Sequence, residues 1–156
     1  MARRLQAEIK QKAPFAGIEE EVYLNVLKTG DVLSQSVETL LRTSGLSLTQ
    51  YNVLRILRGA GDAGLTCGET AQRMVTHDPD VTRLLDRLER RGLITRSRDA
   101  RDRRVVTARI TREGLRLIAA LDKPLAALQR RLFRHMPHQE LKKLSSLLEK
   151  VRAGME

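Results

Sequence analysis

The sequence predicts a mainly α-helical protein that carries one small β-hairpin. Three observations lead to this fold class. Apolar residues recur every three or four positions along most of the 156 residues, which is the spacing of one helix face. Aromatic residues make up only 3% and tryptophan is absent, so the core must be built from Leu, Val, Ile and Ala, which suit helices. Residues 93–110 instead carry strand-like residues around an arginine-rich turn.

The N-terminal part is predicted to be a flexible basic arm followed by one long helix. Residues 1–17 are polar and basic and are interrupted by a proline and a glycine, so we expect them to become ordered only against a partner. Residues 18–46 contain apolar residues at helical spacing from about position 19 to position 43, although Gly30 weakens the middle of this helix.

Two capping boxes predict the next two helices. Ser47 and Gln50 have the spacing S-x-x-Q, and Thr66 and Glu69 repeat it as T-x-x-E. In such a box the hydroxyl accepts from the backbone three residues on, while the longer side chain reaches back to the first backbone N–H. Each pair therefore marks a helix start. Residues 59–64 contain three glycines and are expected to be a flexible link.

A short amphipathic helix is predicted next. Asp78 is a good N-cap and Pro79 a good first helical residue, because proline has no N–H to leave unpaired. Gly92 can take the left-handed conformation that ends the helix. The predicted buried face consists of Val81, Leu84, Leu85 and Leu88, and the outward face of Arg83, Asp86, Arg87 and Arg90.

A hairpin is predicted immediately after this helix. Residues 93–98 and 104–110 are strand-like, and residues 99–103, with the sequence DARDR, form the turn between them. Two short helices joined by a few residues and followed by a hairpin match a winged helix-turn-helix, which we assign to residues 47–111.

The C-terminal part is predicted to be two further helices. Thr111 can cap a long helix that should be kinked at Pro124, and a last helix starts at about His138. Both carry apolar stripes that the small central module does not need. Residues 112–156, together with residues 18–46, are therefore expected to form a helical dimerisation layer. The alternative is that these stripes pack within one subunit.

The charge distribution favours a polyanionic partner. The formal net charge is +10, and residues 73–116 hold 13 arginines against 7 acidic residues, a net +6, with no lysine. Such a cluster fits nucleic acid or an anionic membrane surface. Cys67 is the only cysteine, so no disulfide can form within the chain. With no secretory h-region and no apolar run of membrane-spanning length, we expect a cytoplasmic protein.

Three runs of sequence resemble the MarR (multiple-antibiotic-resistance regulator) family of winged-helix transcription factors. These runs are LTQYNVLRIL, TCGETAQRM and DVTRLLDRLERRGLITRSRDARDRRVVTARITREG, and the resemblance covers about residues 48–117. It implies a homodimer whose recognition helices enter successive major grooves of a pseudo-palindromic operator in double-stranded DNA, while the wings reach the minor grooves. It also implies repression that is relieved by a small-molecule or oxidative signal.

The candidate DNA-binding residues fall into two groups. Side chains at the N-terminal end of an inserted helix reach base edges most easily, so we expect Asp80, Thr82, Arg83 and Arg87 at the major groove. Asp78 is better suited to capping. The resemblance points to Arg104 as the residue that enters the minor groove. Asp102 could hold the Arg104 guanidinium by a charge-assisted hydrogen bond, while Arg101 and Arg103 contact phosphates.

Other functions find less support in the sequence. No grouping typical of an enzyme is present, and we expect no cofactor and no metal; His135 and His138 are separated by a helix-breaking proline. Two alternatives stay open: a redox-responsive regulator that uses Cys67, and a winged-helix protein-interaction module. The resemblance places a ligand pocket beside the dimerisation helices, near Tyr51, and the basic composition favours a small anionic aromatic effector. The apolar and aromatic face needed for membrane binding is missing.

Overall fold

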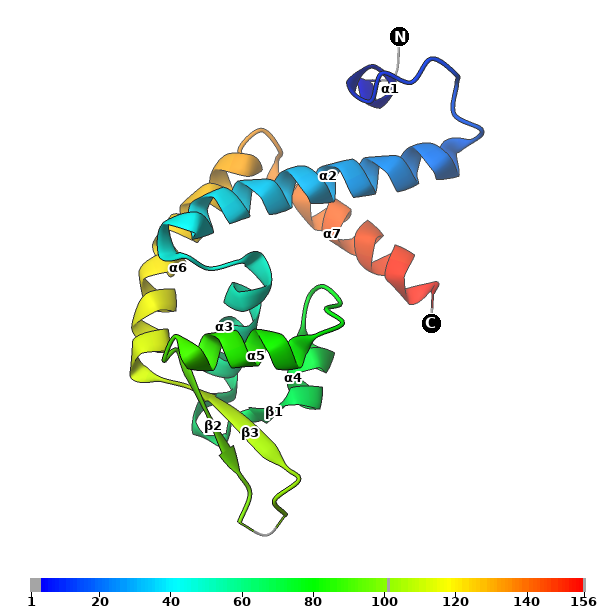
Figure 1. Cartoon of the computed structure of the whole chain (residues 1–156). Helices are drawn as coiled ribbons and strands as arrows, with labels where there is room; N and C mark the ends of the chain where they lie inside the picture. The colour runs from blue at the N-terminus through cyan, green and yellow to red at the C-terminus, as the bar shows by residue number, and fades with distance from the viewer. Residues whose placement is uncertain (1–3, 101, 156) are drawn as a thin grey trace.

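The computed structural model describes residues 4–100 and 102–155. They form a lobe that contains the sheet and the shorter helices, and a layer of long helices (Figure 1). The elements are α1 (Arg4–Glu8), α2 (Ile18–Leu41), η1 (Arg42–Ser44), α3 (Leu48–Ala60), η2 (Gly61–Ala63), β1 (Leu65–Thr66), α4 (Cys67–Arg73), α5 (Val81–Arg90), β2 (Ile94–Arg98), β3 (Val106–Ile110), α6 (Arg112–Leu132) and α7 (His138–Ala153). The predicted class, mainly α with a small β wing, is confirmed.

The sheet has three antiparallel strands in the order β1-β3-β2. Ile94 pairs with Ile110 at the base of the wing, and Arg98 pairs with Val106 near its tip. The sequence interpretation missed β1, in which Leu65 pairs with Ala108. Residues 59–64 are accordingly not a free link, because α3 extends to Ala60 and the turn η2 leads directly into β1. A strand of two residues is too short to show an alternating pattern.

The core lies where α3 meets α5, α6 and the sheet. Leucines of α3 and α5, an isoleucine of β2 and an isoleucine of α6 have at most 2% of their surface exposed. These residues are Leu54, Leu57, Leu85, Leu88, Ile94 and Ile118. The first turn of α6 lies so close to the wing that a Cβ on Gly114 would overlap the backbone carbonyl of Leu93. Only glycine fits this approach without a backbone shift.

Both predicted capping boxes are confirmed. The Gln50 N–H donates to Ser47 Oγ over 3.1 Å, and the Ser47 N–H donates to Gln50 Oε1 over 3.1 Å. At α4 the Glu69 N–H donates to Thr66 Oγ1, and the Thr66 N–H donates to Glu69 Oε2 over 2.8 Å. This backbone hydrogen bond lowers the pKa of Glu69. The two boxes fix where the helices of the lobe begin.

The predicted start of α5 is wrong by two residues. Asp80, not Asp78, is the N-cap, and its carboxylate accepts from the Arg83 N–H over 3.0 Å. Asp78 instead accepts the Asp80 N–H over 2.8 Å, so Pro79 belongs to a turn before the helix. Two acids flank the proline, and a pattern of capping residues does not distinguish which of them will cap the helix.

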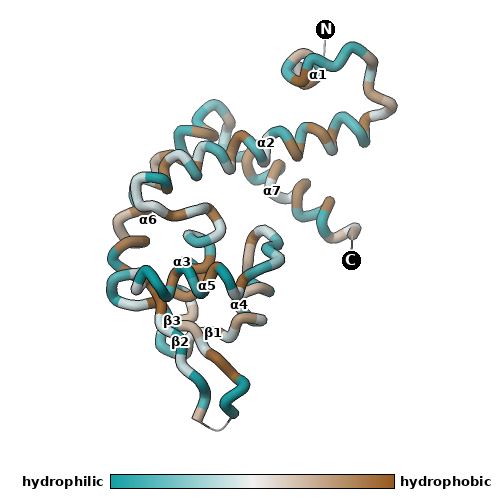
Figure 2. The backbone as a smooth tube through the Cα atoms, viewed as in Figure 1, coloured by the Kyte–Doolittle hydropathy of each residue, from teal (hydrophilic) through white to brown (hydrophobic). Residues whose placement is uncertain are grey.

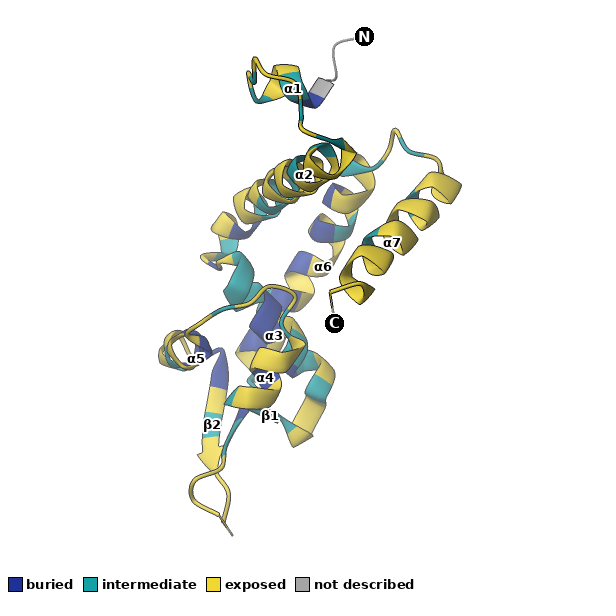
Figure 3. Cartoon of the chain, turned by 90° about the vertical axis from the view of Figure 1, so that its right-hand side faces the viewer, coloured by how far each residue is buried: buried dark blue, intermediate teal, exposed yellow. Residues whose placement is uncertain are grey.

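The outer helices carry apolar side chains that this chain leaves exposed. The C-terminal half of α2 packs on α3 and α6, but its N-terminal half and all of α7 stand away from the body (Figures 1 and 3). Val22, Val26, Leu147 and Val151 keep 44–50% of their surface exposed. Figure 2 shows apolar positions along both helices. None of the described helices is long and apolar enough to span a membrane.

The N-terminal arm contains one helical turn. In α1 and the loop after it, the side-chain amides of Gln6 and Gln11 both donate to the Ala13 carbonyl, over 3.0 and 3.1 Å. These contacts are local to the arm. The predicted C-terminal helices are present, and α6 runs as one helix through Pro124. Thr111 caps it as predicted, accepting the Gly114 N–H over 3.0 Å.

Candidate nucleic-acid interface

The second helix of the helix-turn-helix, α5, presents a polar face to solvent. Its four apolar residues, predicted to be buried, all lie in the core. On the opposite side Thr82, Arg83, Arg87 and Arg90 are exposed. The helix is anchored on one face and leaves its other face free to contact a groove.

At the N-terminus of α5, one acid orients one arginine. Asp80 Oδ1 caps the helix, and Asp80 Oδ2 lies 3.3 Å from Arg83 Nε. The two side chains are 49% and 69% exposed, so this ion pair adds little stability in water. In this structure the pair places the guanidinium beside the N-terminal end of the helix. Asp80 therefore takes the capping role that was predicted for Asp78.

At the wing tip, the acids organise the backbone. Asp102 Oδ1 accepts the Arg104 N–H over 2.9 Å, and the Asp102 N–H donates to Asp99 Oδ1 over 3.1 Å. The prediction that Asp102 holds the Arg104 guanidinium is not met among the described residues, because a short Asp side chain bonds the backbone two residues on more readily. Arg103 and Arg104 are exposed. Arg101 lies outside the described residues.

An arginine that the sequence interpretation did not single out joins the wing to α5. Arg96 of β2 lies 2.6 Å from Asp86 and 2.7 Å from Glu89 of α5, and its backbone N–H also donates to Glu89 Oε1 over 3.0 Å. The hydrogen bond with Glu89, followed by that with Asp86, raises the pKa of Arg96 against the opposing effect of burial. The sequence does contain one indication of this contact, because Asp86 and Glu89 are three residues apart and so lie on the same side of the helix.

Replacing Arg96 with Met should free the wing to move relative to α5. Both acids would lose their cation while most of the side-chain packing is kept. We expect faster backbone hydrogen exchange at β2 and β3, with the global unfolding midpoint lowered by only a few degrees. Arg98→Met, an exposed arginine on the same strand, is the matched control. Unchanged exchange in Arg96→Met would show that the wing is held by its strand pairing alone.

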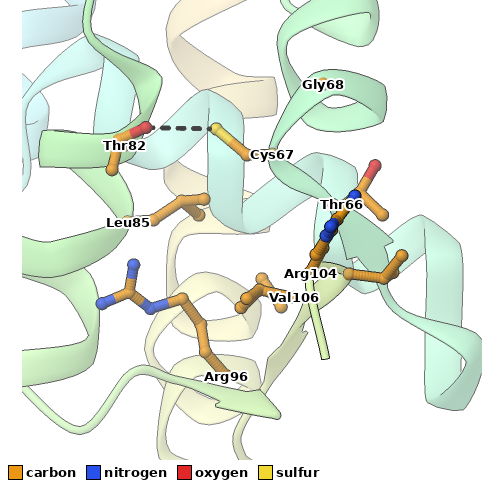
Figure 4. A pocket seen from close by; sticks show the side chains of 10 residues that line it. Thr66, Cys67, Gly68, Thr82, Leu85, Arg96, Arg104 and Val106 are labelled. Carbon is orange, nitrogen blue, oxygen red and sulfur yellow. Dashed lines mark hydrogen bonds between the residues drawn. The ribbon is translucent and has the colours of Figure 1, made fainter. Parts of the chain in front are cut away.

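A hollow of about 440 Å³ lies between α4, α5 and the wing (Figure 4). Cys67 and Thr82 contact each other at its wall, with Sγ 3.5 Å from Thr82 Oγ1, and Arg96 and Arg104 line it from the side of the wing. The contact places the half-buried Cys67 against the recognition helix. The hollow lies apart from the expected ligand region near Tyr51. Across residues 4–100 and 102–155, no three His, Cys, Asp or Glu side chains are grouped as metal ligands.

Together, the fold and these surfaces define a winged helix-turn-helix DNA-binding protein. The MarR family model matches residues 46–106. A MarR transcription factor from Planctomyces limnophilus is 36% identical, with 87% of this chain and 98% of that chain aligned at a TM-score of 0.67. The chain therefore belongs to the MarR family of transcription regulators.

Two other similar structures contain bound molecules. MepR of S. aureus, solved as a complex with DNA, is 25% identical over 85% of this chain and 96% of that chain, with a TM-score of 0.75. CouR of Rhodococcus jostii RHA1, solved with p-coumaroyl-CoA, is 25% identical over 88% of this chain and 95% of that chain, with a TM-score of 0.72. One relative has thus been solved on DNA and another with a small molecule.

Proposed function

We propose that this protein is a homodimeric repressor that binds a pseudo-palindromic operator and is released by a small anionic aromatic ligand. The observation that carries the proposal is the pairing of two exposed arginine surfaces, one on α5 and one on the wing, at a relative position held by Arg96. A single exposed arginine surface is common and does not by itself indicate DNA binding. Two such surfaces at a helix and a hairpin fit the two grooves of a DNA duplex.

The two surfaces have different tasks in this proposal. The N-terminal half of α5 enters the major groove, where Arg83 and Arg87 contact guanine edges or phosphates and Thr82 contacts a neighbouring base. The wing follows the backbone into the flanking minor groove. Arg104 enters the groove, and Arg101 and Arg103 contact phosphates on either side.

The exposed apolar faces of α2 and α7 support the dimer. Contiguous apolar surface on outer helices is unfavourable in water, and α7 buries none of its residues against its own chain. The alternative of packing within one subunit therefore leaves Leu147 and Val151 of α7 about half exposed. A second copy related by a twofold axis would cover both helices and place two α5 helices on one side, which matches a pseudo-palindromic site.

Repression and release follow from the same geometry. A dimer whose helices and wings cover the operator excludes another protein from that DNA. The ligand-bound relative CouR supports control by a small molecule, and the net charge of +10 favours an anionic one. A ligand that binds the DNA-free arrangement better than the bound one shifts the equilibrium towards release.

The deciding experiment is a footprint of the full-length protein on the DNA that flanks its own gene, combined with sedimentation of the free protein. We expect a sedimenting dimer and two protected half-sites with centres about 10 bp apart, with binding that weakens steeply as salt rises. Addition of phenolic carboxylates should remove the footprint for at least one compound. A monomer, or equal affinity for random DNA, would contradict the proposal and favour a protein-interaction module.

The same footprint tests the redox alternative that uses Cys67. Peroxide is applied to the wild type and to Cys67→Ser, in which a hydroxyl replaces the thiol beside Thr82. The ligand-release proposal predicts the same footprint for both proteins after treatment. Loss of the wild-type footprint alone would assign the signal to the thiol.

A further inference from the structure

The turn that follows α2 and η1 offers two backbone carbonyls to a side chain distant in sequence. After η1 the chain turns through Gly45, which has φ +65°. The Gly45 N–H donates to the Arg42 carbonyl over 3.0 Å, and the Leu46 N–H donates to the Leu41 carbonyl over 3.3 Å. This is the Schellman pattern of helix closure. It leaves the Ser44 and Gly45 carbonyls, at the negative end of the helix dipole, for another partner.

That partner is Arg91, the residue that caps the C-terminus of α5. Arg91 Nη1 donates to the Gly45 carbonyl over 2.7 Å, and Nη2 donates to the Ser44 carbonyl over 3.2 Å. The guanidinium packs directly over Gly45, where an added Cβ would lie 3.5 Å from Nη2. Two parallel donors on one planar group match two successive carbonyls. A lysine ammonium at the same place could not reproduce this fork.

The same end of α5 is also bonded to α6. Gly92, with φ +69°, follows Arg91, and its carbonyl accepts from Thr111 Oγ1 over 2.7 Å. The Thr111 N–H donates to the Leu93 carbonyl over 3.0 Å. Residues 91–93 thus connect the recognition helix to both long helices of the outer layer. Arg91 provides the connection to the turn that follows α2, and Thr111 provides the connection to α6.

We propose that Arg91 is a positioning residue that fixes the angle between α5 and the dimerisation helix α2, and through it the half-site spacing that the dimer accepts. This inference rests on the proposed function. The ten residues of α5 span about 15 Å, so a tilt of about 13° about its C-terminal end moves its N-terminal end by about 3.4 Å, one base-pair step. A small change at Arg91 is therefore amplified at Arg83, which lies near the other end of the helix.

The test measures affinity against spacing. The operator defined by footprinting is prepared with its native spacer and with spacers one base pair shorter and longer, together with a duplex in which one half-site is scrambled. Wild-type protein, Arg91→Met and Arg91→Lys are compared with Arg90→Met, which removes an equal charge from the adjacent exposed residue. Thermal unfolding of each variant establishes that it is folded. If Arg91→Met is unstable, Arg91→Lys still tests the inference, because it keeps the positive charge but not the planar pair of donors.

We expect the affinity of the wild type to fall by about tenfold or more on operators with either altered spacer. Each one-base-pair change also rotates the two half-sites relative to each other. In both Arg91 variants this discrimination should fall by about threefold or more, while Arg90→Met keeps the wild-type profile. A profile that is unchanged in the Arg91 variants, or flattened equally in Arg90→Met, would overturn the inference. Failure of the wild type to prefer the operator over random DNA would instead refute the proposed function.

Discussion

Arg104→Ala is expected to lower the affinity of the dimer for its operator by about 100-fold or more. A guanidinium in the minor groove makes charge-assisted hydrogen bonds of about 1.5–3 kcal/mol, and the dimer loses one set on each side. The side chain is exposed and its backbone is held by Asp102, so folding should not change. Preference for A·T pairs beside the core site should also fall, because the width of the minor groove is no longer read.

Arg103→Ala is the matched control, because it removes the same charge from the neighbouring exposed position. If Arg103 contacts only phosphate, its loss should weaken binding to all sequences by a similar, smaller factor. Fluorescence anisotropy on operators with A·T-rich or G·C-rich flanks measures both variants. Equal losses for the two variants on both flanks would show that Arg104 does not enter the minor groove.

Arg83→Ala is expected to reduce discrimination between the operator and random DNA by about 1–3 kcal/mol for each half-site. Asp80 holds this guanidinium at the N-terminal end of α5, the end that reaches base edges. If Arg83 contacts a guanine, affinity for the operator falls and affinity for random DNA changes little. If it contacts a phosphate, both affinities fall equally and the salt dependence becomes less steep.

Arg90→Ala serves as the control for this experiment, since it lies on the same helix but near its C-terminal end. Its loss should affect operator and random DNA alike. A larger loss of discrimination in Arg90→Ala than in Arg83→Ala would mean that α5 enters the groove in the opposite orientation.

Several features followed directly from local sequence patterns. The boxes at Ser47 and Thr66 and the cap at Thr111 each involve residues within three positions, so spacing alone determines them. The buried face of α5 likewise follows from helical periodicity. The arginine-rich turn was recognisable for the same reason, because it lies between two strands of five residues each.

Other features depend on contacts that periodicity and capping patterns do not encode. β1 is a strand only because it pairs with β3. Leu65 and Thr66 are too few to show a strand pattern in the sequence. In the sequence nothing distinguishes Arg96 from the other arginines of residues 73–116. The fold distinguishes it by placing it beside Asp86 and Glu89. The position of the α5 cap was ambiguous because two acids flank Pro79, and the turn through Asp78 selected the later one.

The sequence by itself determined the fold class, the family, the helix starts at Ser47, Thr66 and Thr111, and the surfaces that carry the arginines. These properties are encoded within a few residues of each other, where periodicity and capping rules apply. Only the tertiary structure decided which contacts Arg96 and Arg91 make within the chain. Arg96 connects the wing to α5 because strand β2 packs beside the helix that carries Asp86 and Glu89. Arg91 connects α5 to the turn that follows α2, whose two carbonyls are 46 and 47 residues away in sequence.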